Sequence, residues 1–211
     1  NDLQGAAAVL DQAVALGGTG DSEDVGALRA HVLHAESIAT DGREEGAMQE
    51  LEQALDVMRR APQRYGRMFV NALVLRARML NADARNEDAD RAAREALDQA
   101  HRLLGPKSAE AVRALEALAV ANDYLRNSDV AFAAARDGYA MARELFDKGD
   151  AHPIYNSVRQ QYAIALIDRD RVREGLDLME ASRKAAAKLF GEDSKITAAY
   201  AATMVKYLIA D

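Results

Sequence analysis

Apolar residues recur along most of the chain at the three- and four-residue intervals of an amphipathic helix. Leu115, Leu118 and Ala119 share one face before a short polar break, and Ala131 and Ala135 share another after it. Breaks of this kind, or breaks that contain glycine or proline, separate all such segments. The pattern predicts helices at about 2–16, 22–40, 44–60, 64–82, 86–104, 108–126, 129–147, 153–168, 171–190 and 193–210.

Small residues repeat at a nearly constant interval within these segments. Ala35, Ala77, Ala119 and Ala163 follow one another at spacings of 42, 42 and 44 residues. Two further sets of small residues keep the same phase, and a polar break divides each copy, so each copy is expected to be a hairpin of two helices. Small side chains allow the paired helices to approach closely. The further sets are Ala47, Ala89, Ala131 and Gly175, and Ala54, Ala96, Gly138 and Ser182.

The three prolines agree with this division. Pro62, Pro106 and Pro153 all fall between copies, where one helix must end and the next begin. We expect one repeat domain over residues 1–211, and because the chain begins with Asn1 rather than Met, a fragment of a larger protein. The expected parts are a half-repeat at 1–20, repeats at about 21–63, 64–106, 107–150 and 151–191, and a half-repeat at 192–211.

A glycine-rich stretch at 17–20 has two interpretations. It has the glycines of a phosphate-binding loop, but the Lys-Ser/Thr pair of that motif does not follow, and a helix rather than a strand precedes it. We interpret it as a turn between repeats, with Asp21 or Ser22 capping the next helix. Ser108 and Ser128 are expected to cap later helices in the same way.

The composition argues against several classes of protein. The 211 residues include 34 acidic and 27 basic side chains, and the net charge of −7 disfavours nucleic-acid binding. Without Cys, disulfides and thiolate zinc sites are excluded, and no apolar run reaches the roughly 20 residues of a membrane span. The Ala- and Arg-rich usage is typical of bacterial proteins from GC-rich genomes. We expect a cytoplasmic protein, or a periplasmic one if a transmembrane segment precedes this chain.

No arrangement of side chains indicates catalysis, a metal or a cofactor, so we expect a protein that is not an enzyme. The best candidate metal ligands, His31 and His34, share a helix face, but the repeat supplies no evident third ligand. We expect both to be partly buried and hydrogen-bonded. His152 precedes Pro153 in a joint between repeats and is expected to be structural, whereas His101 is expected to be exposed.

The spacing of small residues and the turn at Gly42-Arg43-Glu44-Glu45 resemble tetratricopeptide repeats. The short form of that repeat is about 34 residues long. Longer copies with joints such as Leu103-Leu104-Gly105-Pro106 resemble the kinesin-light-chain-like subfamily, a form also found in bacterial signalling proteins. The resemblance implies an all-α fold, a right-handed superhelix of antiparallel helix hairpins whose concave side is lined by the first helix of each pair. Four residues replace the Leu or Asn that is common at their positions: His31, His34, Arg76 and Tyr162.

The resemblance also implies that the concave groove binds a peptide or protein segment. Arginine and amide side chains alternate there with aliphatic ones, and such donors can pair the carbonyl and carboxylate groups of a bound segment. The Lys/Asn pattern of a chaperone-tail carboxylate clamp is not reproduced. Glu36, Glu116, Val120, Ser157 and Ile167 lie on the same helix faces. The residues expected to bind the segment are Arg29, Val32, Asn71, Val74, Arg78, Asn81, Arg113, Tyr124, Gln160 and Ile164.

A second hypothesis is a regulatory or sensory domain of a larger bacterial signalling protein, for example a serine/threonine kinase, that acts through self-association. It is motivated by the final predicted helix, which carries Met204, Val205, Tyr207, Leu208 and Ile209 and is unusually apolar for the end of a repeat array. Under both hypotheses the expected partner is a protein or peptide. Neither nucleic acid nor membrane insertion is expected for this segment.

Overall fold

A computed structural model describes residues 23–40, 44–146 and 152–208. These residues form helices, turns and bends, with no strand among them. The helix expected at 2–16, the glycine-rich turn at 17–20 and Ile209 lie outside the described residues. Asp21 and Ser22, expected to cap the next helix, also lie outside them.

The chain divides into two compact units, which are described separately. Unit 1 (Asn1–Pro106) and unit 2 (Lys107–Asp211) meet at a boundary between two predicted repeats. The single array expected from the sequence stays a prediction.

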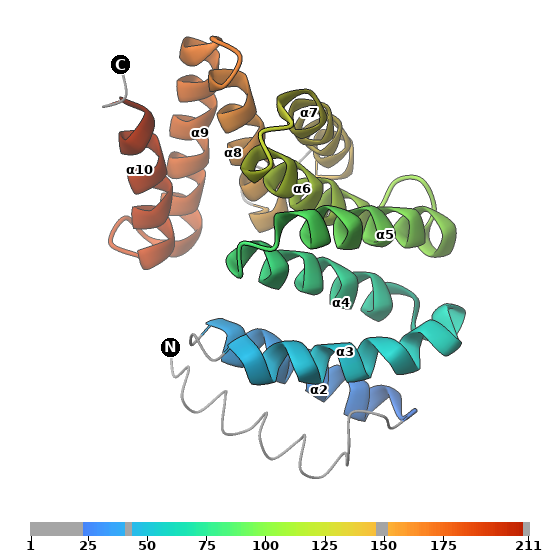
Figure 1. Ribbon diagram of the computed structural model, residues 1–211. Helices are drawn as coiled ribbons and strands as arrows, with labels where there is room; N and C mark the ends of the chain where they lie inside the picture. Colours follow the sequence, from blue (N-terminus) through green and yellow to red (C-terminus); the bar gives the residue numbers. More distant parts are fainter. Residues whose placement is uncertain (1–22, 41–43, 147–151, 209–211) are drawn as a thin grey trace. The chain divides into compact units, whose positions relative to one another are not determined.

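The described residues of unit 1 form two helical hairpins (Figure 1). The first pairs α2 (Val25–Thr40) with α3 (Glu44–Arg60), and the second pairs α4 (Pro62–Ala82) with α5 (Asn86–Leu104). The first helices α2 and α4 also contact each other, as do α3 and α4. All four helices begin and end within a few residues of their predicted bounds.

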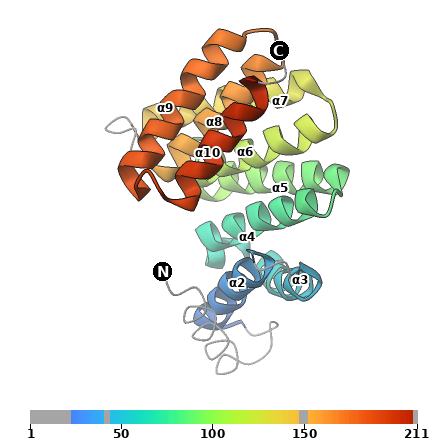
Figure 2. The ribbon, with the colours of Figure 1, turned by 90° about the vertical axis from the view of Figure 1, so that its left-hand side faces the viewer.

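The part of unit 2 that the structure describes forms two further hairpins and one additional helix (Figure 2). The hairpins are α6 (Ala109–Tyr124) with α7 (Ser128–Leu145), and α8 (Pro153–Ile167) with α9 (Val172–Phe190). The last helix, α10 (Lys195–Leu208), packs on α9, and the first helices α6 and α8 contact each other. The order of hairpins within each unit is the one predicted from the sequence.

The small residues of the repeat are buried where paired helices meet. Ala35, Ala77, Ala119 and Ala163 are all fully inaccessible to solvent, and the other two sets are buried as well. The approach is closest at Gly175, where an added Cβ atom would lie 2.7 Å from the main-chain oxygen of Ala163. The small residues predicted from the repeat therefore set the distance between the two helices of a hairpin.

Side chains cap several helices. The backbone N–H of Ala27 donates to Asp24 Oδ1 (2.8 Å), and that of Ala111 donates to Ser108 Oγ (3.1 Å). The predicted cap at Ser108 is therefore confirmed. The cap predicted at Ser128 is wrong, because Ser128 is the first residue of α7 and Asn127 precedes the helix.

A residue with a left-handed backbone conformation recurs in the turn inside the hairpin, at the same spacing as the small residues. Ala84, Arg126 and Asp170 have φ values of 58°, 61° and 60°, and they are separated by the same 42 and 44 residues. Just beyond Ala84, the N–H of Arg85 donates to the carbonyl of Leu80 (2.8 Å). This left-handed residue ends the first helix and reverses the chain into the second.

Candidate interaction surface

The predicted peptide-binding residues of unit 1 do not share one environment. Arg29 and Arg78 are exposed, and Asn71 is half-buried. Val32 and Val74 are only 8% and 3% exposed. They therefore contribute to the packing of unit 1, and their inclusion in an accessible surface is corrected.

Arg78 is bridged to the neighbouring first helix. Its Nη1 atom lies 3.6 Å from Glu36 Oε1, and the two side chains are 59% and 45% exposed. A second pair lies near the start of α4, where Arg64 Nη1 lies 3.3 Å from Oε2 of Glu23, two residues before α2. Exposed ion pairs thus connect α4 with α2 and with the residues that precede α2, and they leave charged groups accessible.

Both amide atoms of Asn81 are buried and have no hydrogen-bond partner among the described residues. It lies in the last turn of α4, two residues before the chain turns into α5. A buried amide without partners costs free energy, and because both of its polar atoms are inaccessible to solvent, Asn81 does not belong to the accessible surface.

The predicted residues of unit 2 lie on α6 and α8. Arg113, Gln160 and Ile164 are half-buried, and Tyr124 is 62% exposed. The hydroxyl of Ser157 on α8 donates to the carboxylate of Glu116 on α6. A polar link between consecutive first helices therefore occurs in this unit too.

The two candidate metal-binding histidines share a carboxylate. His31 Nδ1 and His34 Nδ1 donate to the two oxygens of Glu50 on α3, at 2.5 and 2.6 Å. His31 is buried and His34 is half-buried. The predicted hydrogen-bonded pair is confirmed, and its role is to join α2 to α3.

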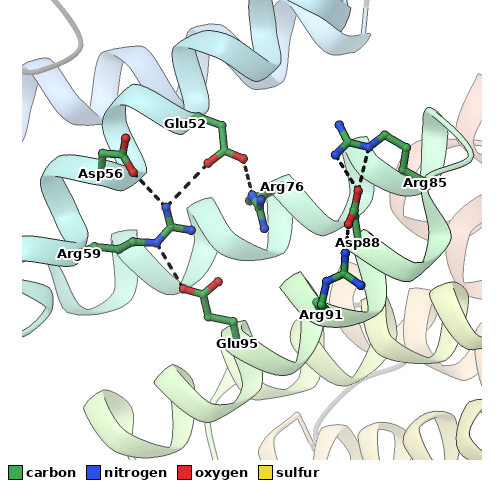
Figure 3. Close-up of polar contacts among 8 residues, drawn as sticks. All are labelled: Glu52, Asp56, Arg59, Arg76, Arg85, Asp88, Arg91 and Glu95. Carbon is green, nitrogen blue, oxygen red and sulfur yellow. Dashed lines mark hydrogen bonds and ion pairs between the residues drawn. The ribbon is translucent and has the colours of Figure 1, made fainter.

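Arg76 belongs to a network of ion pairs within unit 1, on α3, α4 and α5 (Figure 3). It donates to Glu52, and Glu52 also lies 3.8 Å from Arg59. Arg59 reaches Asp56 at 3.1 Å and Glu95 at 3.4 Å. Burial lowers the pKa of Arg59, but Glu95 and Glu52 raise it by more. Arg76 therefore has a partner within its own unit.

A second network in Figure 3 surrounds one carboxylate of α5. Asp88 accepts hydrogen bonds from Arg85, at 2.6 Å, and from Arg91. The hydrogen bond from Arg85 is the main reason why the pKa of Asp88 is lowered. The arginines of the second network are more than half exposed, whereas most side chains of the first are about one-third exposed or less, so the second network contributes little to stability.

Tyr162 joins an aromatic cluster in unit 2. Its ring stacks on that of Tyr139, with centroids 5.3 Å apart, and lies 5.9 Å from that of Phe132. Tyr139 also stacks on Tyr155 at 5.7 Å. Burial and the hydrogen bond to Tyr155 raise the pKa of Tyr139 to about 12. Each of the four residues that replace the common Leu or Asn thus contacts another helix of its own unit. These residues are His31, His34, Arg76 and Tyr162.

A buried arginine distinguishes the fourth copy from the others. Arg159 is 3% exposed, and its Nε and Nη2 donate to Ser182 Oγ (2.9 Å) and Asn156 Oδ1 (2.8 Å). Its guanidinium carbon lies 5.1 Å from the ring centroid of Tyr155. The equivalent positions one repeat earlier, 44 residues before Asn156, Arg159 and Ser182, are Val112, Leu115 and Gly138.

Two carboxyl groups that the sequence did not single out come together at the ends of α6 and α8. Burial is the main reason why the pKa of Asp168 is raised, and the charge and hydrogen bond of Asp123 follow. The positive charges of Arg126 and Lys206 lower the pKa of Asp168, but by less than burial and Asp123 raise it. Burial and these carboxyl groups also raise the pKa of Tyr207 on α10 to about 12.

Among the described residues, no three His, Cys, Asp or Glu side chains are placed to hold a metal ion together. The two remaining histidines lie outside these clusters. His101 is exposed, and the His152 ring stacks on Phe146 with centroids 3.8 Å apart.

No described helix combines the length and the apolar character that a membrane span requires.

No family model matches the sequence, and no curated protein matches it. Several solved structures resemble the fold. BtubC (BKLC) from P. vanneervenii has 14% identity and a TM-score of 0.73, with 99% of this chain and 85% of that chain covered. A point variant of a putative kinesin light chain with nearly identical TPR-like repeats, from Podosopora anserina, has 19% identity and a TM-score of 0.66, with 88% and 87% covered.

A further structure of that putative kinesin light chain has 17% identity and a TM-score of 0.63, and 88% of each chain is covered. At these identities the likeness shows the fold. The predicted all-α tetratricopeptide-like fold with kinesin-light-chain-like repeats is confirmed.

Proposed function

We propose that this chain, which has the tetratricopeptide-like fold, is a non-enzymatic interaction module. It binds an extended peptide or protein segment along the concave face of its first helices. The observation that carries the proposal is the exposed polar face between α2 and α4. Arg78 is exposed there beside Glu36, and Arg29 on α2 is also exposed. Arginine side chains of this kind pair with the main-chain carbonyls and carboxylates of a bound segment.

A random-peptide display library tests this proposal. Peptides of about twelve residues are selected on the purified chain and then compared on the variant Arg78→Gln/Asn71→Ala. Enriched peptides should lose about tenfold in affinity on this variant, because two donors of the surface are removed. The control is Arg102→Gln, which removes an equally exposed arginine from α5. No enrichment over empty matrix, or equal losses on the variant and the control, contradicts the proposal.

A second candidate function is a regulatory domain of a larger bacterial signalling protein that acts through self-association. It is favoured by α10, on which Ile196, Val205 and Leu208 are each about half exposed. Exposed aliphatic side chains on the last helix of a stack suit contact with another helix. Sedimentation over a wide concentration range tests it, and a strict monomer excludes this form of regulation.

A further inference from the structure

Helix α10 has the register of the first helices. Its first residue, Lys195, follows the first residue of α8 by 42 positions. Its cap repeats that of α6, because Ser108 Oγ and Ser194 Oγ each accept a hydrogen bond of 3.1 Å from the backbone N–H three residues later. In this register Val205 occupies the place that Ala163 has on α8. Helix α10 is therefore the first helix of a further copy.

The face of α10 that corresponds to the pairing face of the other first helices is exposed. Ala163 is inaccessible to solvent on α8, where its carbonyl oxygen adjoins Gly175 of the paired helix α9. Its equivalent Val205 is 48% exposed. Leu166 is 1% exposed, whereas its equivalent Leu208 is 51% exposed. Among the described helices only α9 packs on α10, so no described helix covers this face.

The four hairpins show what kind of helix covers such a face. In α3, α5, α7 and α9, two buried small residues lie seven positions apart, and the residue four positions after the first of them is buried too. Small side chains at this spacing allow the second helix to approach the first closely. The three positions are Ala47, Leu51 and Ala54 in α3, Ala89, Ala93 and Ala96 in α5, Ala131, Ala135 and Gly138 in α7, and Gly175, Met179 and Ser182 in α9.

A further segment of the sequence has the same pattern. Ala6, Leu10 and Ala13 have this spacing in the helix that the sequence predicts at 2–16. The charges of the two elements are also complementary, because residues 2–16 contain two Asp and no basic side chain, whereas Lys195–Leu208 contains two Lys and no acidic one. The segment precedes the first hairpin and α10 follows the last described one, so pairing them between two copies continues the order of helices from one copy into the next.

Building on the self-association proposed above, we infer that a second copy of this chain covers α10, with residues 2–16 of that copy forming the second helix of the pair. Ala6 of one copy then lies beside Val205 of the other, as Gly175 lies beside Ala163 within the last described hairpin. The two contacting surfaces differ, so the contact is heterologous and continues from copy to copy. A contact between two α10 helices would instead be symmetric and would stop at a dimer.

Two variants that each block one of the two surfaces test this inference by sedimentation. Val205→Glu places a charge on the exposed face of α10, and Ala6→Glu places one in the segment at 2–16. The unmodified chain should form species that grow with concentration, and each variant alone should remain a monomer. An equal mixture of the two variants should form dimers and nothing larger, because one complementary pair of intact surfaces remains.

Matched controls place the same charge outside the expected contact. Ala199→Glu changes an exposed residue that lies about a third of a turn around α10 from Val205. Ala8→Glu changes the position that corresponds to Gln49 and Asp177, which are both exposed. Both controls should associate as the unmodified chain does, and unchanged thermal melting of every variant shows that it is folded.

Cysteine pairs give a second measurement that needs no bulky substitution. The chain has no cysteine, so Ala6→Cys and Val205→Cys on separate copies introduce the only thiols. Under a mild thiol oxidant, their mixture should form a disulfide between positions 6 and 205, identified by mass spectrometry. Ala8→Cys in place of Ala6→Cys should give about tenfold less of the mixed dimer, because a disulfide requires Cα atoms within about 7 Å of each other.

Three outcomes overturn the inference. An unmodified chain that stays monomeric at every concentration excludes self-association altogether. Association that Val205→Glu abolishes and Ala6→Glu leaves intact indicates a symmetric contact of α10, so the self-association proposed above stands while its head-to-tail form fails. Association without mixed dimers of the two variants, and without the disulfide between positions 6 and 205, places the contact elsewhere on the chain.

Discussion

Arg78 on α4 lies 3.6 Å from Glu36 on α2, and these two residues are one repeat period, 42 residues, apart. Arg64 and Glu23 are linked in the same way at a separation of 41 residues, as are Ser157 and Glu116 in unit 2. Consecutive copies stack with equivalent helices side by side, so residues one period apart become neighbours. Complementary polar residues at this separation are therefore a signal that can be found in the sequence.

Removing the link between Arg78 and Glu36 should hardly change stability. Both side chains are about half exposed, so we expect a coupling energy of about 0.5 kcal/mol or less. A double-mutant cycle with Arg78→Gln and Glu36→Gln, measured by urea unfolding, gives this energy. A coupling well above about 1 kcal/mol would assign the pair a structural role and weaken its assignment to binding.

Gly175→Ala should destabilise the protein by about 2–3 kcal/mol. The new Cβ would lie 2.7 Å from the carbonyl oxygen of Ala163, and this backbone atom can move only if α8 and α9 separate. The matched control is Gly46→Ala on α3, where an added Cβ meets nothing within 4 Å. That change should instead stabilise by about 0.5–1 kcal/mol through helix propensity. Similar effects of the two substitutions on the urea midpoint would contradict the close approach at Gly175.

Ala84→Gly should stabilise the protein by about 0.5–1 kcal/mol. Ala84 has a φ of 58°, where glycine has no Cβ penalty. Ala82→Gly serves as the control. Ala82 is the last residue of α4, so this variant should be destabilised, by at most about 1 kcal/mol, through the lower helix propensity of glycine. Thermal melting of the two variants gives the sign directly. A lower melting temperature for Ala84→Gly would show that the left-handed turn is not strained.

Asp168→Asn should stabilise the protein at neutral pH, and the gain should vanish in acid. Burial and Asp123 raise the pKa of Asp168, so the folded state binds its proton more tightly than the unfolded chain does. The free energy of unfolding therefore falls as the pH rises from the ordinary pKa of 3.8 to the raised pKa of Asp168. Above the raised pKa it stays at this lower value. We expect a gain of up to about 1 kcal/mol at pH 7, because the pair is partly exposed. Urea unfolding at pH 7 and pH 3 measures it, and a gain that is equal at both would contradict the carboxyl pair.

Arg159→Leu should destabilise by about 3 kcal/mol when made alone, because Asn156 and Ser182 lose the donor that reaches them in the core. The triple variant Asn156→Val/Arg159→Leu/Ser182→Ala introduces the apolar or small residue types of the equivalent positions in other copies. It should recover most of the loss, since neither the amide of Asn156 nor the hydroxyl of Ser182 is then left in the core without this partner. Urea unfolding of both variants tests the argument. A triple variant as unstable as the single one would show that shape, rather than polar pairing, decides packing here.

The sequence by itself determined the helices, their hairpins and the residues that hold them together. Two short-range properties were sufficient: apolar spacing along each helix, and small residues that recur at a constant period wherever two helices must approach closely. Ala35, Ala77, Ala119 and Ala163 are buried for this reason. The cap at Ser108 was also predictable, because it depends on neighbours only three residues away.

The tertiary structure decided which side chains of the predicted surface are accessible and which are paired. Val32 and Val74 follow the same helical periodicity as Arg29 and Arg78, yet burial by neighbouring elements removes them from the surface. Periodicity gives a direction around one helix, whereas accessibility depends on the helices packed against it. The carboxyl pair of Asp123 and Asp168 depends on such packing too, because it exists only where the ends of α6 and α8 come together.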